Sequence, residues 1–291
     1  MKKTVVVITG PTASGKTSLA IRLSKKFGGE IVSADSRAIF KGIDIASAKP
    51  SIEERDGVPH WGFDLVEIGE RFTAADFQKY AYKKFEEIIS RGKIPFLVGG
   101  TGLYIDSILN DYDFGGEVDE SVRNSLFRKS TKELQQEIKL RNLVMPENSK
   151  NKRYLVRTIE KSMSQKRNNC KNNNTFDYIV VGITTPREEL RERIFSRNEH
   201  FFGSGIIEEA ILLGSKYGWG SEAMTANAYP LIRKYIDGEL SREELIEKMS
   251  VRDWRLAKRQ ITFMKRNEQI SWMSLIDAEQ FISTKLSKNF D

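Results

Sequence analysis

Residues able to bind phosphate stand near the start of the chain, in the stretch Gly10–Thr17. This stretch reads G-x-x-x-x-G-K-T, the P-loop pattern, in which backbone N–H groups close around phosphate oxygens and the following helix adds its positive dipole end. Lys16 supplies a charge between phosphates, and the Thr17 hydroxyl is a possible ligand for Mg²⁺. The pattern therefore predicts a site for a di- or triphosphate. The residues of this predicted site are Gly10, Thr12, Ala13, Ser14, Gly15, Lys16 and Thr17.

A carboxylate follows the second apolar segment of the chain. Glu30–Ala34 is predicted as a strand, and Asp35 comes directly after it. Ligands of open α/β sheets bind at the carboxyl ends of the strands, so Asp35 should face the P-loop. The other clear strands, 94–98 and 178–181, are not followed by an acid. Asp35 is therefore the candidate catalytic carboxylate, although an acid in this place can also cap a helix.

A second glycine-rich turn, Gly99–Gly102, follows the strand at 94–98 and contains Thr101. Because this turn also lies at the carboxyl end of a strand, its amides and the Thr101 hydroxyl should reach the same edge of the sheet. Together with the P-loop, the turn predicts a phosphate pocket with two sides.

Three further side chains each allow two interpretations. Arg193 and Arg197 lie one turn apart on the helix predicted to start after Pro186, so they share a face. That face could clamp a phosphate, or it could simply be solvated. His60 could contact a substrate or could be a packing histidine.

The last long helix is predicted from a capping box at Ser241–Glu244 to about Arg266. Between residues 252 and 266 there are six basic residues and one acid, Asp253. Such an excess beside an apolar seam is typical of a surface that binds a nucleic-acid backbone. The predicted basic stripe consists of Arg255, Lys258, Arg259, Lys265 and Arg266.

These side chains need a scaffold of strands and helices in alternation. The short apolar strands are separated by helical segments, which predicts an α/β fold with a P-loop NTPase-like parallel sheet flanked by helices. The segment 115–176 instead contains helical patterns at about 119–127, 131–141 and 149–163, and ends in a polar run at 167–174. We therefore predict a core made of 1–114 and 177–291, with 115–176 as a helical insertion.

The composition excludes several classes of protein. The 291 residues carry 47 Lys and Arg against 40 Asp and Glu, and this excess favours polyanionic partners only weakly. Cys170 is the only cysteine and there are two histidines, so a disulfide within the chain is impossible and a zinc site is not expected. No apolar run has membrane-spanning length, and the N-terminal run is too short for a signal peptide. We therefore expect a cytoplasmic protein without membrane contact.

Seven stretches of the chain together resemble the tRNA dimethylallyltransferases. The match is dense through residues 4–110, weaker in the predicted insertion, and resumes near 186–272. P-loop kinases share only the first stretch. The seven stretches are Gly10–Thr17, Ser33–Arg37, Asp44–Pro50, Val58–His60, Ala74–Gln78, Val98–Tyr104 and Ala257–Gln260.

The resemblance implies transfer of a dimethylallyl group from dimethylallyl diphosphate to the exocyclic amine of the adenine just 3′ of the tRNA anticodon. The P-loop would hold the donor's diphosphate, and Lys16, Thr17 and Mg²⁺ would neutralise the departing pyrophosphate. Asp35 would accept the amine proton, and Thr101 would hydrogen-bond near the flipped base. Arg193 and Arg197 complete the expected diphosphate site, and we expect a monomer. The expected tRNA contacts are Asp35, Ser36, Arg37, Ala38, His60, Thr101, Arg153, Arg157, Arg255, Lys258 and Arg259.

The chain departs from the family pattern at four positions. The family usually has Gln in place of Ala38, Tyr in place of Phe40, His or Leu in place of Trp61, and a basic residue in place of Tyr154. A paralogue with altered tRNA preference or weakened activity is therefore one alternative. An isopentenyltransferase acting on free AMP and a small-molecule P-loop kinase are two others, and the basic helix argues against both. A non-catalytic RNA-binding protein would have no use for Asp35 beside two phosphate-binding turns.

Overall fold

The structure, a computed structural model, describes residues 3–114, 120–163, 176–225 and 228–290. The chain divides into two compact units, one formed by Met1–Asp111 with Thr175–Asp291 and the other by Tyr112–Asn174. The polar run predicted as a loop at 167–174 lies outside the described residues.

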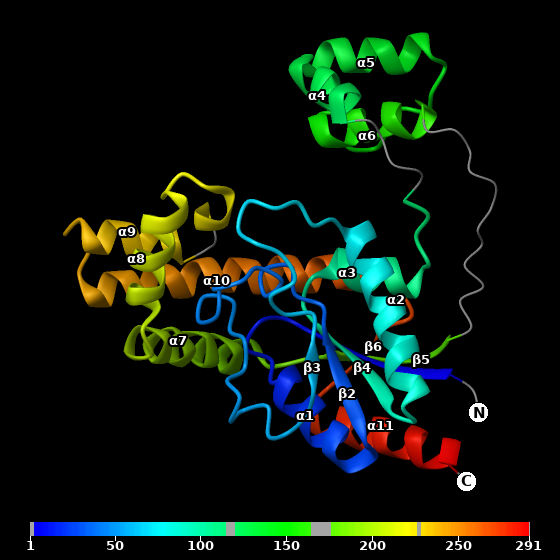
Figure 1. The fold of residues 1–291 in the computed structure, drawn as a ribbon, viewed down its shortest axis with the longest axis vertical. Helices are drawn as coiled ribbons and strands as arrows, with labels where there is room; N and C mark the ends of the chain where they lie inside the picture. Colours follow the sequence, from blue (N-terminus) through cyan, green and yellow to red (C-terminus); the bar gives the residue numbers. More distant parts are fainter. Residues whose placement is uncertain (1–2, 115–119, 164–175, 226–227, 291) are drawn as a thin grey trace. The chain divides into compact units, whose positions relative to one another are not determined.

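The larger unit is built on one sheet of six parallel strands in the order β3-β2-β4-β1-β5-β6 (Figure 1). The predicted α/β fold with a parallel sheet is therefore confirmed. The sequence did not reveal β3 and β6, because strands of two or three residues are too short to show a periodic pattern. The strands are β1 Lys3–Thr9, β2 Gly29–Ser33, β3 His60–Trp61, β4 Ile94–Gly99, β5 Phe176–Ile183 and β6 Ser271–Met273.

Helices cover both faces of this sheet. Alternate residues of β1 show the two cores, since Val5 and Val7 pack in one cluster and Val6 and Ile8 in the other. The first cluster is completed by α2 and α3, and the second by α1 and α11. These helices are α1 Lys16–Phe27, α2 Ala74–Ser90, α3 Gly102–Leu109 and α11 Leu275–Phe290.

A further group of helices packs around α10, which contacts α7, α9 and α3 (Figure 1). Ser241 caps α10 with the predicted capping box. The prediction that α10 is the last long helix is wrong, because α11 follows it after the short strand β6. Among the described residues, every helix is too short or too polar to cross a bilayer. The helices of this group are α7 Arg187–Gly203, α8 Ile206–Tyr217, the 3₁₀ turn η1 Glu222–Thr225, α9 Tyr229–Ile236 and α10 Arg242–Met264.

The smaller unit contains helices close to the three predicted positions. They are α4 Glu120–Arg128, α5 Thr131–Leu140 and α6 Lys152–Met163. Leu126, Leu134 and Ile159 belong to its own apolar core. Glu160 is 1% exposed and accepts two hydrogen bonds from Arg123, at 2.5 and 2.7 Å, so a paired charge is part of that core.

Candidate active site

The loop that follows β1 and the carboxyl ends of β2 and β4 border one cavity of about 500 Å³. It brings together the P-loop, the turn after β2 and Thr101, which are far apart in the sequence. The Asp35 carboxylate, the Lys16 ammonium group and the Arg197 guanidinium group therefore border the same cavity. The predicted site residues that line it are Thr12, Ala13, Gly15, Lys16, Thr17, Asp35, Ser36, Arg37, Ala38, His60, Thr101, Arg197 and Arg259.

The P-loop joins β1 to α1 by a tight backbone path. Gly15, the N-cap of α1, has φ +82°, a left-handed conformation that favours glycine. Gly10 lies where a Cβ would come 2.9 Å from the Oγ of Ser14, a fully buried residue. Lys16 donates from Nζ to the carbonyl of Pro11 at 3.1 Å. Gly10 and Ser14 thus shape the loop, while Lys16 and its neighbours face the cavity.

The environment of Lys16 changes its acidity. Burial lowers the pKa of Lys16 from its ordinary value to about 8, with Asp35 opposing the shift and Arg197 adding to it. A phosphate beside this ammonium group would favour its charged form. The binding of a phosphate should therefore depend on pH.

Asp35 stands at the end of β2 in a hydrogen-bonded turn. Its Oδ1 accepts from the amides of Arg37 at 2.8 Å and Ala38 at 3.4 Å. The Thr101 Oγ1 accepts from the Ser36 amide at 3.0 Å, which joins this turn to the end of β4. Oδ2 of Asp35 has no hydrogen-bond partner among the described residues, so it is the oxygen left to act on a substrate.

The second glycine-rich turn, predicted to form one side of a phosphate pocket, packs against α10. A Cβ on Gly100 would lie 2.4 Å from the side chain of Gln260, and one on Gly102 would lie 2.2 Å from that of Phe263. The Thr101 N–H donates to the backbone carbonyl just beyond β2, at 3.1 Å. These glycines therefore let α10 pack closely, and Thr101 contributes its side chain to the cavity.

Gln260 is a site residue to which sequence reasoning assigned no role. Its Oε1 accepts the backbone N–H of Thr12 at 2.9 Å, so α10 holds the P-loop directly. Gln260 lies seven residues after Asp253, and both line the cavity. The signal was this spacing of two helical turns, which places polar side chains of α10 on one face.

The two arginines of α7 have different surroundings. Arg197 donates to the Thr12 hydroxyl and to Asp253 Oδ2, the latter at 2.7 Å. Arg193 lies beside the P-loop but pairs with Glu189 at 2.5 Å. The interpretation as a solvated face is therefore wrong for Arg197, whose charge points into the cavity.

His60 lines the cavity from β3. Its Nδ1 lies 2.8 Å from the Val58 carbonyl, so Nδ1 carries the proton, and its ring stacks on Phe63 at 5.9 Å. Burial lowers the pKa of His60. His60 is therefore a neutral imidazole that packs on Phe63 and also lines the cavity.

Exposed cations surround Trp254 on α10. The charged groups of Arg187, Arg191 and Lys258 lie 5.6, 5.3 and 5.9 Å from the Trp254 ring. The predicted stripe is exposed along its length and is continued by cations of α7. A nucleic-acid backbone would find several charges here within a short distance.

In the smaller unit the two predicted RNA contacts differ. Arg153 is exposed. Arg157 donates to the Phe114 carbonyl and lies 3.4 Å from Glu160. The Arg157 guanidinium therefore helps to hold its own unit together.

Comparison with known proteins identifies the family. A family model described as IPP transferase matches residues 38–267. A tRNA dimethylallyltransferase of Streptococcus mutans is 36% identical over 96% of this chain and 95% of its own length. The chain belongs to the IPP transferase family. A tRNA dimethylallyltransferase of Bacillus subtilis is 34% identical, with 94% of this chain and 91% of the relative covered.

Solved structures of IPP transferases share the fold. A tRNA isopentenylpyrophosphate transferase of Bacillus halodurans matches with a TM-score of 0.73 at 30% identity, covering 99% of this chain and 98% of that one. A tRNA isopentenylpyrophosphate transferase of Staphylococcus epidermidis gives 0.70 at 30% identity, covering 98% and 99%. A eukaryotic dimethylallyltransferase acting on tRNA gives 0.78 at 23% identity, covering 94% of this chain and 74% of that one, and shows likeness of fold.

Three departures from the IPP transferase pattern have visible surroundings. Trp61 donates from Nε1 to the buried Glu30 at 2.7 Å, and the Lys84 ammonium lies 4.1 Å from its ring. Ala38 is 2% exposed and lines the cavity. Tyr154 is 50% exposed on α6. Trp61 is thus a packing residue of the sheet edge, and only Ala38 of these three borders the site.

Proposed function

We propose that this chain transfers a dimethylallyl group from dimethylallyl diphosphate to the exocyclic amine of the adenine 3′-adjacent to the anticodon in tRNA. The observation that carries the proposal is the shared cavity, in which Asp35 lies with Lys16 and Thr17 of the P-loop. A proton acceptor beside a diphosphate site is what this displacement requires. The relatives named tRNA dimethylallyltransferase support both the donor and the acceptor.

The reaction forms one bond and breaks another. The adenine nitrogen attacks the allylic carbon of the donor, the carbon–oxygen bond to the diphosphate breaks, and the nitrogen loses one proton. Asp35 accepts that proton through Oδ2, because Oδ1 is occupied by the amides of Arg37 and Ala38. General-base assistance of this kind typically contributes roughly 10²–10⁴ in rate.

The departing diphosphate needs positive charge. Lys16 and Arg197 line the cavity and can supply it, together with the P-loop amides. Thr12 connects these groups, since its hydroxyl accepts from Arg197 and its N–H donates to Gln260. The P-loop and its contacts from α7 and α10 thus form the donor side of the cavity.

Mg²⁺ fits this cavity as a partner of the diphosphate. Among the described residues no three His, Cys, Asp or Glu side chains are grouped as a protein metal centre. Mg²⁺ in phosphate sites commonly takes one or two protein oxygens, with the phosphates and water completing its shell. The Thr17 hydroxyl borders the cavity as the candidate oxygen. The ion would supply charge neutralisation at the leaving group.

The acceptor adenine must leave its stack to reach a cavity of this kind. Thr101 and Ser36 line the side where the base would meet Asp35. The exposed cations of α10 and α7, and Arg153 of the smaller unit, are candidates for contacts with the tRNA backbone. We place this activity in a monomer of the cytoplasm.

One assay tests the function. Radiolabelled dimethylallyl diphosphate is supplied with bulk tRNA, with AMP, or with neither, and ATP hydrolysis is followed in parallel. Label is expected in tRNA alone. Label in AMP would favour an isopentenyltransferase acting on the free nucleotide, and phosphoryl transfer from ATP without prenyl transfer would favour a small-molecule kinase.

A further inference from the structure

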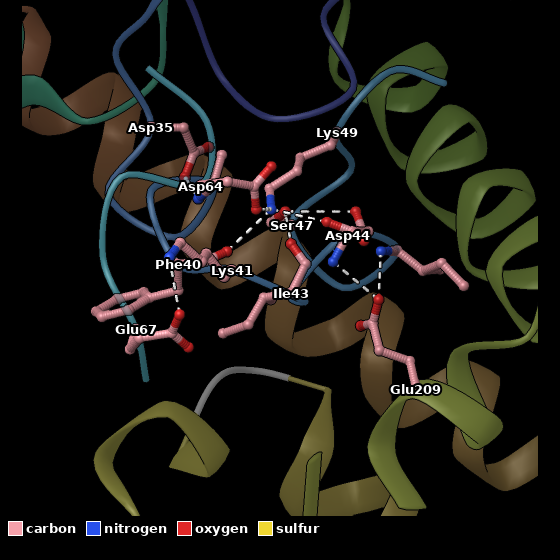
Figure 2. Close-up of polar contacts among 12 residues, drawn as sticks. Asp35, Phe40, Lys41, Ile43, Asp44, Ser47, Lys49, Asp64, Glu67 and Glu209 are labelled. Carbon is pink, nitrogen blue, oxygen red and sulfur yellow. Dashed lines mark hydrogen bonds and ion pairs between the residues drawn. The ribbon is translucent and has the colours of Figure 1, made fainter. Parts of the chain in front are cut away.

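Lys49 is a buried cation to which the proposed reaction assigns no role. Its side chain is 4% exposed. Its Nζ donates to the Phe40 carbonyl at 2.9 Å, to Asp44 at 2.7 Å and to Asp64 at 2.6 Å (Figure 2). An ammonium group has three donors, so this one is fully satisfied. Burying a charge is costly unless it is paired in this way, so Lys49 and its three partners form one fixed cluster.

Two of the three partners of Lys49, Phe40 and Asp44, belong to the segment 35–50, which borders one side of the cavity and which we call the acceptor wall. The third partner, Asp64, lies outside this segment. Asp35 begins this wall, and its Oδ1 accepts from the Ala38 amide at 3.4 Å. The Ala38 carbonyl in turn accepts the Asp64 N–H at 3.2 Å. The Lys49 ammonium group binds the Asp64 carboxylate. Lys49 is therefore linked through Asp64 and Ala38 to the turn of Asp35.

The far end of the acceptor wall is a single helical turn at 44–47. The Lys49 N–H donates to the Asp44 carbonyl at 3.0 Å and the Ala48 N–H to the Ile45 carbonyl at 2.9 Å, the pattern of a Schellman motif. The carboxylate of Glu209 on α8 accepts the free amides at the start of this turn, at distances from 2.6 to 3.0 Å (Figure 2). The N-terminus of a helical turn attracts an anion, and here that anion is the Glu209 carboxylate.

We propose that Lys49 is a positioning residue for Asp35. The ammonium group holds the turn of Asp35, the turn at 44–47 and the segment of Asp64 in one arrangement, while Glu209 holds the wall against α8. This inference rests on the proposed role of Asp35 as the general base. The P-loop shares no hydrogen bond with this network among the described residues, so the donor side should not depend on Lys49.

The test compares turnover with binding at the donor side. In Lys49→Met the carboxylates of Asp44 and Asp64 lose their shared cation and the wall relaxes. We expect kcat at saturating tRNA and donor to fall roughly 10- to 100-fold, because a displacement of about 1 Å can cost about 10²-fold. The affinity for inorganic pyrophosphate, measured by calorimetry, should remain within about twofold. Asp64→Asn keeps the acceptor oxygen but removes a charge, and it should lower kcat less while pyrophosphate affinity is again retained.

Lys84→Met is the matched control. Lys84 is also largely buried, at 14% side-chain exposure, and pairs with Glu87 at 2.5 Å, but it lies on α2 outside the cavity lining. Its kcat should equal that of the wild type even if the melting temperature falls. The same loss of kcat in Lys84→Met, or a joint loss of kcat and pyrophosphate affinity in Lys49→Met, would mean a general structural role and would overturn the inference. If Lys49→Met does not fold, Asp64→Asn decides by the same two measurements.

The failure of this inference differs from the failure of the proposed function. Wild-type turnover in Lys49→Met alongside an inactive Asp35→Asn would reject only the positioning role. Wild-type turnover in Asp35→Asn would reject Asp35 as the base.

Discussion

The two sides of the cavity are built in different ways. The donor side is based on a continuous strand, turn and helix, in which the conformation at Gly15 and the amides of α1 arise from neighbours in the sequence. Helices α7 and α10 add contacts at Thr12. The acceptor wall at 35–50 has little regular structure and depends on charged side chains from elsewhere, Asp64 and Glu209 among them. Distant changes should therefore affect the donor side only modestly, whereas the wall should be sensitive to the loss of a single charge.

Both sides nevertheless contain an alanine in the left-handed region. Ala13 of the P-loop has φ +61° and Ala48 of the wall has φ +55°. This conformation costs a residue with a Cβ roughly 1–2 kcal/mol. Each side therefore retains local strain, which its surrounding contacts hold in place.

The largest loss of turnover should follow a change of Asp35, at the start of the acceptor wall. Asp35→Asn keeps an oxygen for the amide of Arg37 but removes the proton acceptor. We expect turnover to fall by roughly 10²–10⁴, with the affinities for tRNA and pyrophosphate retained. The measurement is single-turnover prenyl transfer. Asp56→Asn is the control, because Asp56 is an exposed partner of Lys25. Near wild-type turnover in Asp35→Asn would reassign Asp35 as a turn cap.

The donor side should respond to pH through Lys16. Its pKa is lowered to about 8, and a bound diphosphate favours the charged form and raises that pKa again. The affinity for pyrophosphate should therefore be full below about pH 8 and should weaken above it, by up to about tenfold per pH unit. Lys16→Met should lack this dependence, and the ratio of the two affinities cancels the titration of pyrophosphate itself. A ratio that is constant from pH 7 to pH 9.5 would contradict the prediction.

A smaller effect is expected where α10 holds the P-loop. Gln260→Met removes the acceptor of the Thr12 N–H. A hydrogen bond of this kind contributes about 1 kcal/mol, so pyrophosphate affinity should fall by roughly fivefold. Gln280→Met, on the exposed face of α11, is the control and should have no effect. Equal affinities in both variants would show that the P-loop keeps its conformation without α10.

Outside the cavity, the exposed cations should affect tRNA alone. Arg255 and Lys258 lie outside the cavity lining, so their joint replacement by Gln should leave pyrophosphate binding and turnover at saturating tRNA unchanged. Each cation that contacts a phosphate should flatten the slope of log affinity against log salt by roughly 0.7–0.9. The control replaces Lys285 and Lys288, exposed on α11, by Gln. Equal slopes in all three proteins would assign the stripe to solvent.

The smallest effect concerns the strain at Ala48. Ala48→Gly relieves the left-handed strain but adds freedom to the unfolded chain, so we expect a net gain in the free energy of unfolding of about 0.5 kcal/mol. Chemical denaturation measures it. Ala46→Gly, in the same turn but without a positive φ among the described backbone angles, should be destabilising. A loss of stability in Ala48→Gly would show that the Ala48 Cβ contributes packing that outweighs its strain.

The P-loop of the donor side and the position of Asp35 on the acceptor wall could be predicted before the fold was seen. The P-loop pattern needs only eight consecutive residues, and Asp35 could be placed because strand and carboxylate are adjacent in the chain. The second glycine turn was located correctly, but its contact with α10 was not foreseen. Whether Gly100 faces a ligand or a helix depends on where α10 lies, and Gln260 is 160 residues away in the sequence.

The sequence alone determined the parallel α/β fold, the P-loop, the position of Asp35 and the basic stripe of α10, because each depends on residue spacing within one element. Only the tertiary structure decided which side chains meet across elements. It paired Asp253 with Arg197, brought Gln260 to the P-loop, and surrounded Lys49 with Asp44 and Asp64. The reason is physical: the local conformation of a chain follows from neighbouring residues, whereas the partner of a buried charge depends on how distant segments fold together.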